Sequence, residues 1–297
     1  MAVLIPHREH VVTGEALCKF QLDRELEYAA RDDIHLTGDL YRPETAAHCP
    51  VVVAVHGGAW KVGDASDFQY WGHWLASRGI AVYSIKYRLV RGEKNRYPAA
   101  VFDVRAAVQF VRANAARLGL DSNRIALMGA SAGAHLSALV ALAGNRELFK
   151  SGQPGDPHIH TTTEVKAVVA AYGVYDMLAQ WHHDQVARPC DQITEIFLGI
   201  RPTEDKFRYF EASPIAYATT HANATSFLVC WGTDDDVVDW QTQSRRFVTA
   251  LKQSGYYVRT VPVNGAPHFW MYAPIDEPHG HAGFLAPKLL RFLRERL

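Results

Sequence analysis

The residues Gly129-Ala130-Ser131-Ala132-Gly133 follow an apolar run at 124–128, and a helical pattern leaves them. A serine on a tight turn between a strand and a helix presents its hydroxyl above the sheet, where it can act as a nucleophile. Glycine suits both ends of such a turn, since a side chain at Gly129 or Gly133 would collide with the neighbouring strand or helix. The pentapeptide alone also fits a glycine-rich turn with an incidental serine, so its meaning depends on the rest of the chain.

Strand and helix patterns alternate along most of the sequence. Residues 51–55 are a continuous β-branched and apolar run, typical of a strand buried on both faces of a parallel sheet. Further strands are expected at 80–85, 125–128, 165–171, 227–231 and 257–263, and helices at 68–78, 99–118 and 132–143. Repeated strand-helix units predict an α/β fold, a mostly parallel twisted sheet with helices on both faces.

Three regions depart from this alternation. Residues 15–26 have a helical pattern, and residues 27–41 alternate as expected of a hairpin that adds an antiparallel edge. The stretches 144–164 and 176–217 are rich in His, Pro, Asp and aromatic residues. Insertions at the carboxyl ends of strands overhang the ligand crevice in open α/β sheets, so we expect both stretches to form small cap insertions. Residues 1–297 are then a single domain.

Composition limits the function classes. The 297-residue chain is 48% hydrophobic, and its 31 basic residues balance 31 acidic ones, which leaves no net field to attract nucleic acid or an anionic membrane. A small neutral molecule is therefore the expected partner, and the oligomeric state stays open, with a homodimer allowed. The apolar patch at residues 2–5 is too short for a signal-peptide core, and no apolar run is long enough to span a bilayer. Four scattered cysteines indicate neither a zinc cluster nor a redox dithiol, so a cytoplasmic location is expected.

A serine nucleophile needs a histidine base, and the base needs a carboxylate that fixes its tautomer. Two loops after later expected strands supply candidates in the order serine, acid, histidine. The loop after 227–231 contains Asp234, Asp235 and Asp236, and the loop after 257–263 contains His268. The chain has fifteen histidines, but His268 is the one in the expected place.

Five stretches together identify a family. They are His56-Gly57-Gly58-Ala59-Trp60, Tyr87-Arg88-Leu89, the Ser131 turn with its Ala134-His135 continuation, the Gly232-Thr233 loop and the His268 loop. In this order, from Glu27 onward, the chain resembles an α/β-hydrolase of the esterase and lipase kind. The resemblance implies that the acid is Asp235, which lies three residues after the glycine of the Gly-Thr pair and before Val-Val, with Asp234 and Asp236 as alternatives.

An oxyanion hole needs backbone amides aimed at the developing negative charge. In this arrangement the residue after the nucleophile, Ala132, supplies one amide, and the glycine-rich loop supplies the others, from Gly58 and Ala59. The methyl group of Ala59 and the side chain of Trp60 are expected to crowd the acyl side and to favour short acyl groups. Trp60 is thus a predicted substrate-binding residue, and Trp181 is predicted to line the pocket from the cap.

The remaining histidines have structural interpretations. His56 is expected to shape the oxyanion loop through hydrogen bonds, and His135 lies one helical turn beyond Ser131. The groups at residues 158–160, 182–184 and 279–281 lack ligand spacing on a helix and cysteine partners, so no metal site is predicted.

These residues favour hydrolysis of a small carboxylic ester through an acyl-enzyme intermediate, without a cofactor. Similar stretches occur in kynurenine formamidases as well as in small carboxylesterases, so a formamide or other amide substrate stays open. A hydrolase fold that only binds a ligand is the third alternative, although such proteins usually lack a member of the triad.

Overall fold

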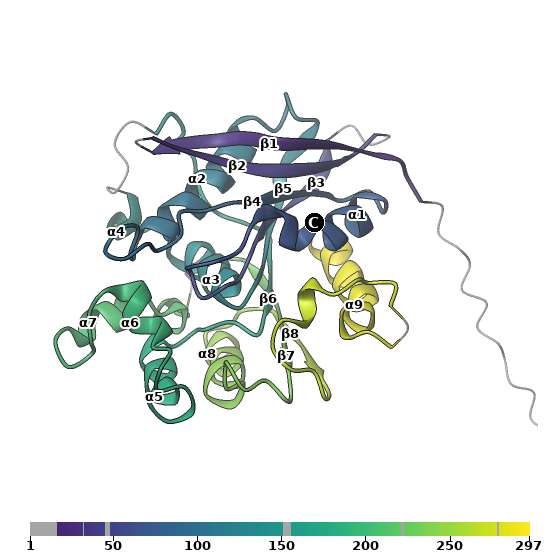
Figure 1. The fold of residues 1–297 in the computed structure, drawn as a ribbon. Coiled ribbons are helices and arrows are strands. Elements are labelled where there is room, and N and C mark those ends of the chain that lie inside the picture. The colour runs from purple at the N-terminus through teal and green to yellow at the C-terminus, as the bar shows by residue number, and fades with distance from the viewer. Residues whose placement is uncertain (1–16, 32, 45–47, 151–155, 221–222, 278) are drawn as a thin grey trace, which may run out of the picture.

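The computed structural model describes residues 17–31, 33–44, 48–150, 156–220, 223–277 and 279–297. Within these residues the centre of the molecule is an eight-stranded sheet of order β1-β2-β4-β3-β5-β6-β7-β8 (Figure 1). The strands are β1 (Phe20–Arg31), β2 (Ile34–Pro43), β3 (Cys49–Val55), β4 (Ala81–Ile85), β5 (Leu120–Ala130), β6 (Ala167–Ala171), β7 (Ser226–Gly232) and β8 (Val258–Val263). β2 is antiparallel to both of its neighbours. The neighbouring strands in the series β4-β3-β5-β6-β7-β8 are all parallel.

Helices cover both faces of this sheet, as the alternating pattern predicts. The α-helices are α1 (Gln69–Ala76), α2 (Ala99–Ala113), α3 (Ala132–Ala143), α4 (Glu147–Lys150), α5 (Met177–Ala187), α6 (Ile193–Leu198), α7 (Lys206–Glu211), α8 (Arg246–Gln253) and α9 (His281–Arg296). Short helical turns are η1 (Ala65–Phe68), η2 (Pro214–Tyr217), η3 (Gln241–Arg245) and η4 (Trp270–Tyr272).

The central strand β3 shows why both faces need a cover. Val51, Val53 and Val55 pack into the core shared with α2, α3 and α8, whereas Val52 and Ala54 pack into the core shared with α1 and α9. Successive side chains of a strand point to opposite faces, so an uninterrupted apolar run is stable only when both faces are buried.

The predicted helix at 15–26 is wrong for its described part, because β1 begins at Phe20 and pairs with β2. A bulge between Asp23 and Leu26, with Glu25 at φ 51°, shifts the alternation of side chains. Leu22 therefore packs against one core and Leu26 against the other. Their four-residue spacing fits a helical repeat, although the bulge places the two side chains on opposite faces of a strand. The predicted hairpin is present and is longer than expected.

The stretch 144–164, predicted to be a cap insertion, does not lie above the carboxyl ends of the strands. Helix α3 starts at the carboxyl end of β5 and runs back, so the chain that follows it leads toward the amino end of β6. Arg105 of α2 donates hydrogen bonds to the carbonyls of Gly144 (2.7 Å) and Phe149 (2.6 Å), and Arg112 donates to Thr162. The described part of this stretch thus lies along α2 rather than above the carboxyl ends of the strands.

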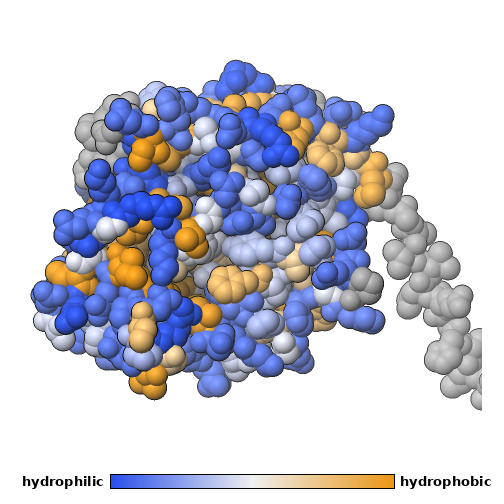
Figure 2. Space-filling model, viewed as in Figure 1, coloured by the Kyte–Doolittle hydropathy of each residue, from blue (hydrophilic) through white to orange (hydrophobic). Residues whose placement is uncertain are grey.

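The stretch 176–217, named here the cap segment, follows the carboxyl end of β6 and contains α5, α6 and α7. Its α6 residue Phe197 stacks on Trp60, with ring centroids 4.3 Å apart. Val186 of α5 and Phe207 and Phe210 of α7 are exposed. The surface where these helices lie, at the lower left of Figure 2, shows hydrophobic side chains scattered among hydrophilic ones. The cap segment therefore contacts the loop after β3, residues 56–60, in which the oxyanion hole is predicted.

Helix α3 packs so closely against β3 that Gly133→Ala should destabilise the fold severely. An added Cβ would lie 1.9 Å from the carbonyl oxygen of Val55, and backbone atoms cannot move aside cheaply. We expect a loss of about 3 kcal/mol or more in the free energy of unfolding, measured by urea denaturation.

The matched control is Gly265→Ala, where φ is +71° and no atom lies within 4 Å of the added Cβ. That variant should lose only about 1–2 kcal/mol in the free energy of unfolding, because alanine is unfavourable in a left-handed backbone conformation. Equal losses in the two variants would contradict the close packing of α3 on β3.

Candidate active site

The Ser131 turn joins β5 to α3 in a strained conformation. Ser131 has φ 55° and ψ −121°, and its amide donates to the carbonyl of Ala171 at the end of β6. A Cβ at Gly129 would lie 2.2 Å from the carbonyl oxygen of Gly133, and one at Gly133 would meet Val55. The collisions predicted for both glycines are thus confirmed, and the turn lifts the Ser131 side chain above the carboxyl edge of the sheet.

The structure brings Ser131, His268 and Asp235 together from three separate loops. His268 Nε2 lies 2.9 Å from Ser131 Oγ, and His268 Nδ1 lies 2.7 Å from Asp235 Oδ2. The side chains of His268 and Asp235 are 2% and 0% exposed, so water cannot compete for their hydrogen bond. With Nδ1–H donated to the carboxylate, Nε2 of a neutral imidazole is free to accept the serine proton.

Asp235 is the aspartate of its loop that reaches His268. Its second oxygen, Oδ1, accepts hydrogen bonds from the amides of Val237 (3.0 Å) and Val238 (2.9 Å). Asp234 and Asp236 are exposed, and Asp234 Oδ1 accepts instead from Thr233 Oγ1. Two amides and one imidazole thus hold Asp235 in a single orientation.

Aromatic rings enclose His268 on two sides. The ring of Tyr172 meets the imidazole nearly edge to face at 4.6 Å, and Phe269 does so at 4.4 Å. Tyr172 is fully buried, whereas Phe269 is half exposed. These rings restrict the imidazole to the plane in which it spans Asp235 and Ser131.

The three amides predicted for an oxyanion hole lie in suitable local structure. Gly58 and Ala59 have φ of +100° and +50°, and within the described residues neither amide donates to a protein acceptor. Ala132 is the first residue of α3, and the amides of a helix's first turn have no acceptor within the helix. All three amides are therefore free to bind a negatively charged oxygen.

Side chains from distant parts of the chain fix residues 56–60, the predicted oxyanion loop. His56 donates from Nδ1 to the carbonyl of Gly57 (2.8 Å), which confirms its predicted structural role, and it stacks on Tyr87. Tyr87 donates its hydroxyl hydrogen to the carbonyl of His56 (3.1 Å), and the amide of Gly57 donates to the hydroxyl of Tyr272 (2.6 Å). Sequence reasoning missed Tyr272, for which only its nearness to His268 in the chain gave a signal.

The two predicted substrate-binding tryptophans both make structural contacts. Trp60 is 0% exposed and packs between the core and Phe197, so its indole has no surface to offer a substrate. Trp181 donates its indole hydrogen to Glu195 Oε1 (2.7 Å) and thereby joins α5 to α6. Burial therefore rules out Trp60 as a pocket wall. Trp181 is partly exposed and stays a predicted pocket residue.

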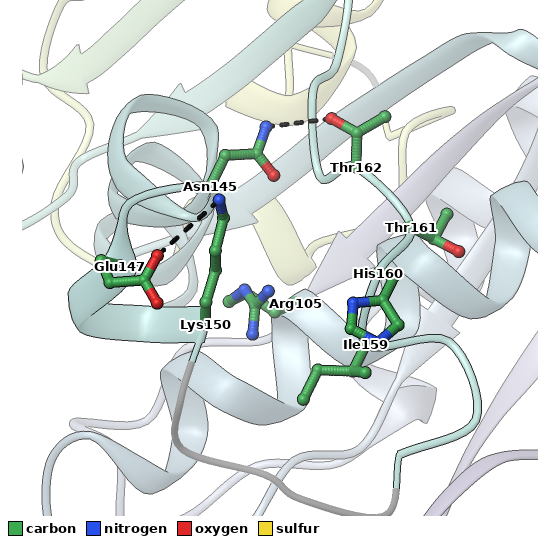
Figure 3. Close-up of a pocket in the computed structure, with 8 residues that line it drawn as sticks. All are labelled: Arg105, Asn145, Glu147, Lys150, Ile159, His160, Thr161 and Thr162. Carbon is green, nitrogen blue, oxygen red and sulfur yellow. Dashed lines mark hydrogen bonds and ion pairs between the residues drawn. The ribbon is translucent and has the colours of Figure 1, made fainter.

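No group of three or more His, Cys, Asp or Glu residues in the described ranges is arranged to hold a metal ion. The pocket in Figure 3 lies along α2, where Arg105, Asn145, Glu147, Lys150 and residues 159–162 line about 470 Å³. Its lining includes none of Ser131, Asp235 and His268, so it is separate from the site at Ser131. In the part of the chain that the structure describes, no helix combines the length and apolar character needed to cross a membrane.

Residues 38–251 match the model of the BD-FAE family, which covers more than half of the chain. The chain belongs to the BD-FAE family of α/β-hydrolases. Among solved structures of this fold, the BD-FAE chain is similar to a truncated carbohydrate esterase from gut microbiota. The two are 23% identical with a TM-score of 0.75, over 95% of this chain and 98% of the other.

Curated relatives of this BD-FAE chain are esterases. It is 34% identical over 220 residues to Esterase LipQ of Mycobacterium tuberculosis, which covers 72% of this chain and 49% of LipQ. It is 33% identical over 231 residues to the probable carboxylic ester hydrolase LipM of the same organism, which covers 77% of this chain and 48% of LipM. The chain thus spans about half the length of the curated relatives it matches.

Burial of His135 predicts a pH-dependent stability. Its ring is fully buried, and burial lowers its pKa from 6.5 to about 4. The unfolded chain takes up a proton near pH 6.5 while the native protein does not, so this contribution to stability is lost as the pH falls from 6.5 toward 4. We expect a slope of about 1.4 kcal/mol per pH unit in that window, measured by urea denaturation.

The control for this prediction is His135→Gln, which removes the titrating ring and keeps an amide of similar reach. Other acid-sensitive groups, His56 among them, are common to both proteins and cancel in the difference. The stability advantage of the wild type should shrink by about 3 kcal/mol between pH 7.5 and 4. A constant difference would show that His135 does not titrate in this way.

Proposed function

We propose that this protein is a serine hydrolase that cleaves a small carboxylic ester through an acyl-enzyme intermediate. The observation that carries the proposal is the hydrogen-bonded series Ser131, His268 and Asp235, which lies at the carboxyl edge of the sheet beside three free amides. In this proposal Ser131 is the nucleophile, His268 the general base and acid, and Asp235 the group that orients His268.

The proposed reaction begins when Ser131 Oγ attacks the ester carbonyl carbon and His268 Nε2 takes the hydroxyl proton. Negative charge then develops on the carbonyl oxygen, where the amides of Gly58, Ala59 and Ala132 donate hydrogen bonds. Each such donor is worth about 3–4 kcal/mol in the transition state. As the tetrahedral intermediate collapses, the bond to the alcohol breaks and His268 gives its proton to the departing oxygen.

Water completes the proposed cycle. A water molecule gives a proton to His268 Nε2 and attacks the acyl carbon, and the second tetrahedral intermediate expels Ser131 Oγ, which recovers the proton. The carboxylic acid leaves, and the residues return to their first protonation state. Every proton in this cycle passes through His268, so no cofactor is required.

The ester class is supported by the relatives. LipQ is named an esterase, and LipM is named a probable carboxylic ester hydrolase. A preference for short acyl groups remains part of the proposal, now carried by the methyl group of Ala59 alone, since Trp60 is buried. Rates on aryl acetate and aryl octanoate test it, and faster cleavage of the octanoate would overturn the crowding argument.

Substitutions within the proposed triad should abolish turnover without unfolding the protein. We expect Ser131→Ala and His268→Ala to lower kcat on an aryl acetate by about 10⁴-fold or more, and Asp235→Asn by about 10³- to 10⁴-fold. Thermal unfolding shows that each variant is folded.

The matched controls are Asp234→Asn and Asp236→Asn, which make the same change on the same loop at exposed positions. Both should keep kcat within about twofold, because surface changes of this kind cost little. Retained turnover in His268→Ala would assign the base elsewhere, and a large loss in Asp234→Asn would assign the acid elsewhere.

The bond that is cleaved is tested by rates on an aryl acetate and on N-formylkynurenine, with Ser131→Ala as the blank. The ester proposal predicts the larger kcat/KM on the aryl acetate. A larger value on N-formylkynurenine would make the protein a formamidase, and no turnover together with no labelling of Ser131 by a fluorophosphonate would make it a binding protein.

A further inference from the structure

The oxyanion loop holds two adjacent residues in an unfavourable backbone conformation. Ala59 has φ 50° and Trp60 has φ 59°, a region that residues other than glycine rarely adopt. Each such residue costs about 1–2 kcal/mol relative to an ordinary conformation. The loop keeps this geometry only if contacts around it are strong enough to offset the cost.

The contacts that hold this conformation converge on the indole of Trp60. The ring is 0% exposed, stacks on Phe197 and meets the imidazole of His135 edge to face at 5.2 Å. Its Nε1–H donates a hydrogen bond to His135 Nδ1 at 3.1 Å. The carbonyl of Trp60 also accepts from the amide of Val90 at 2.9 Å.

These partners fix the protonation state of His135 without ambiguity. An indole nitrogen can only donate, so His135 Nδ1 must be the acceptor and carries no proton. His135 Nε2 lies 2.8 Å from the carbonyl oxygen of Ala212, which can only accept, so Nε2 carries the hydrogen. A neutral imidazole of this one tautomer satisfies both partners, and an imidazolium would face the indole N–H with a second donor.

His135 joins three parts of the proposed site. It lies in the first turn of α3, where its amide donates to the carbonyl of Ser131 at 3.0 Å. Its ring contacts the oxyanion loop at Trp60 and the cap segment at Ala212. The nucleophile turn, the oxyanion loop and the cap segment therefore share one buried side chain.

We propose that His135 is a positioning residue, which holds the amides of Gly58 and Ala59 at the oxyanion through its hydrogen bond to Trp60. The inference rests on the proposed function, since it concerns the same site. Without an acceptor at this position the indole N–H is buried and unpaired, and the loop can relax from its left-handed conformation. The amides then leave the position at which they meet the transition state.

The test measures kcat and KM on an aryl acetate for Trp60→Phe, His135→Leu and the double variant. Trp60→Phe keeps an aromatic ring for the stack on Phe197 and removes the N–H donor together with part of the indole. We expect kcat to fall about 10- to 100-fold in each single variant, with KM changed less than about threefold, because an oxyanion donor acts in the transition state rather than on bound substrate. The double variant should lose little more than either single variant, because both break one contact.

Two further variants separate positioning from general stability. His135→Gln offers an amide oxygen toward Trp60 and an amide hydrogen toward Ala212. The decrease in log kcat should therefore be smaller in His135→Gln than in His135→Leu by at least about a third. Tyr209→Phe removes another buried hydrogen bond in the cap segment, from the Tyr209 hydroxyl to the carbonyl of Ile200 (2.9 Å), and it should leave kcat unchanged.

The outcomes distinguish the inference from the proposed function. If Ser131→Ala is inactive while Trp60→Phe and His135→Leu, shown to be folded by thermal unfolding, keep the wild-type kcat, the positioning role is overturned and the function stands. A rise in KM with unchanged kcat, or an equal loss in Tyr209→Phe, also overturns it. If the wild type cleaves the ester no faster than Ser131→Ala, the proposed function fails and the inference fails with it.

Discussion

The close approach of α3 to β3 and β5 is the constraint on which the rest of this structure depends. With no room for a Cβ at Gly129 or Gly133, the helix begins directly above the strand ends, and Ser131 is forced to φ 55°. That backbone leaves the first amides of α3 and the serine hydroxyl pointing to the same space. The strain is local, and the buried apolar strands on both sides of the turn supply the stability that offsets it.

The parallel sheet then determines which loops can meet at this point. β5, β6 and β7 run in the same direction, so the chain after each strand emerges at one edge. Asp235 follows β7 and His268 follows β8, and the loop after β3 carries Gly58 and Ala59 to the same edge. Residues as far apart in the sequence as Gly58 and His268 come together because strand direction, rather than nearness in sequence, sets where side chains converge.

This convergence explains which features the sequence could predict. The Ser131 turn, the aspartate-rich loop after β7 and the place of His268 follow from strand order and local glycine chemistry, which leave a direct pattern in the sequence. The choice of Asp235 over Asp234 and Asp236 came instead from the family resemblance. The segment around Glu25 left a misleading pattern, because the spacing of Leu22 and Leu26 fits a helix while a bulge places the two side chains on opposite faces of a strand. The stretch 144–164 could not be placed from composition, since polar loops at the two edges of a sheet have similar residues.

The direction of a side chain was the part that sequence reasoning could not reach. Trp60 follows Ala59, whose amide is proposed for the oxyanion hole, and nothing in the sequence says that the indole of Trp60 is buried and donates to His135. The partners of the two buried histidines show what this orientation means for the chemistry. An imidazolium needs an acceptor at each nitrogen, and His268 has the carboxylate of Asp235 at Nδ1 and an oxygen of Ser131 at Nε2. His135 has a donor at Nδ1 and an acceptor at Nε2, so its surroundings stabilise only the neutral ring. One histidine can therefore carry a proton through the proposed cycle, while the other, one helical turn from the nucleophile, cannot compete for it.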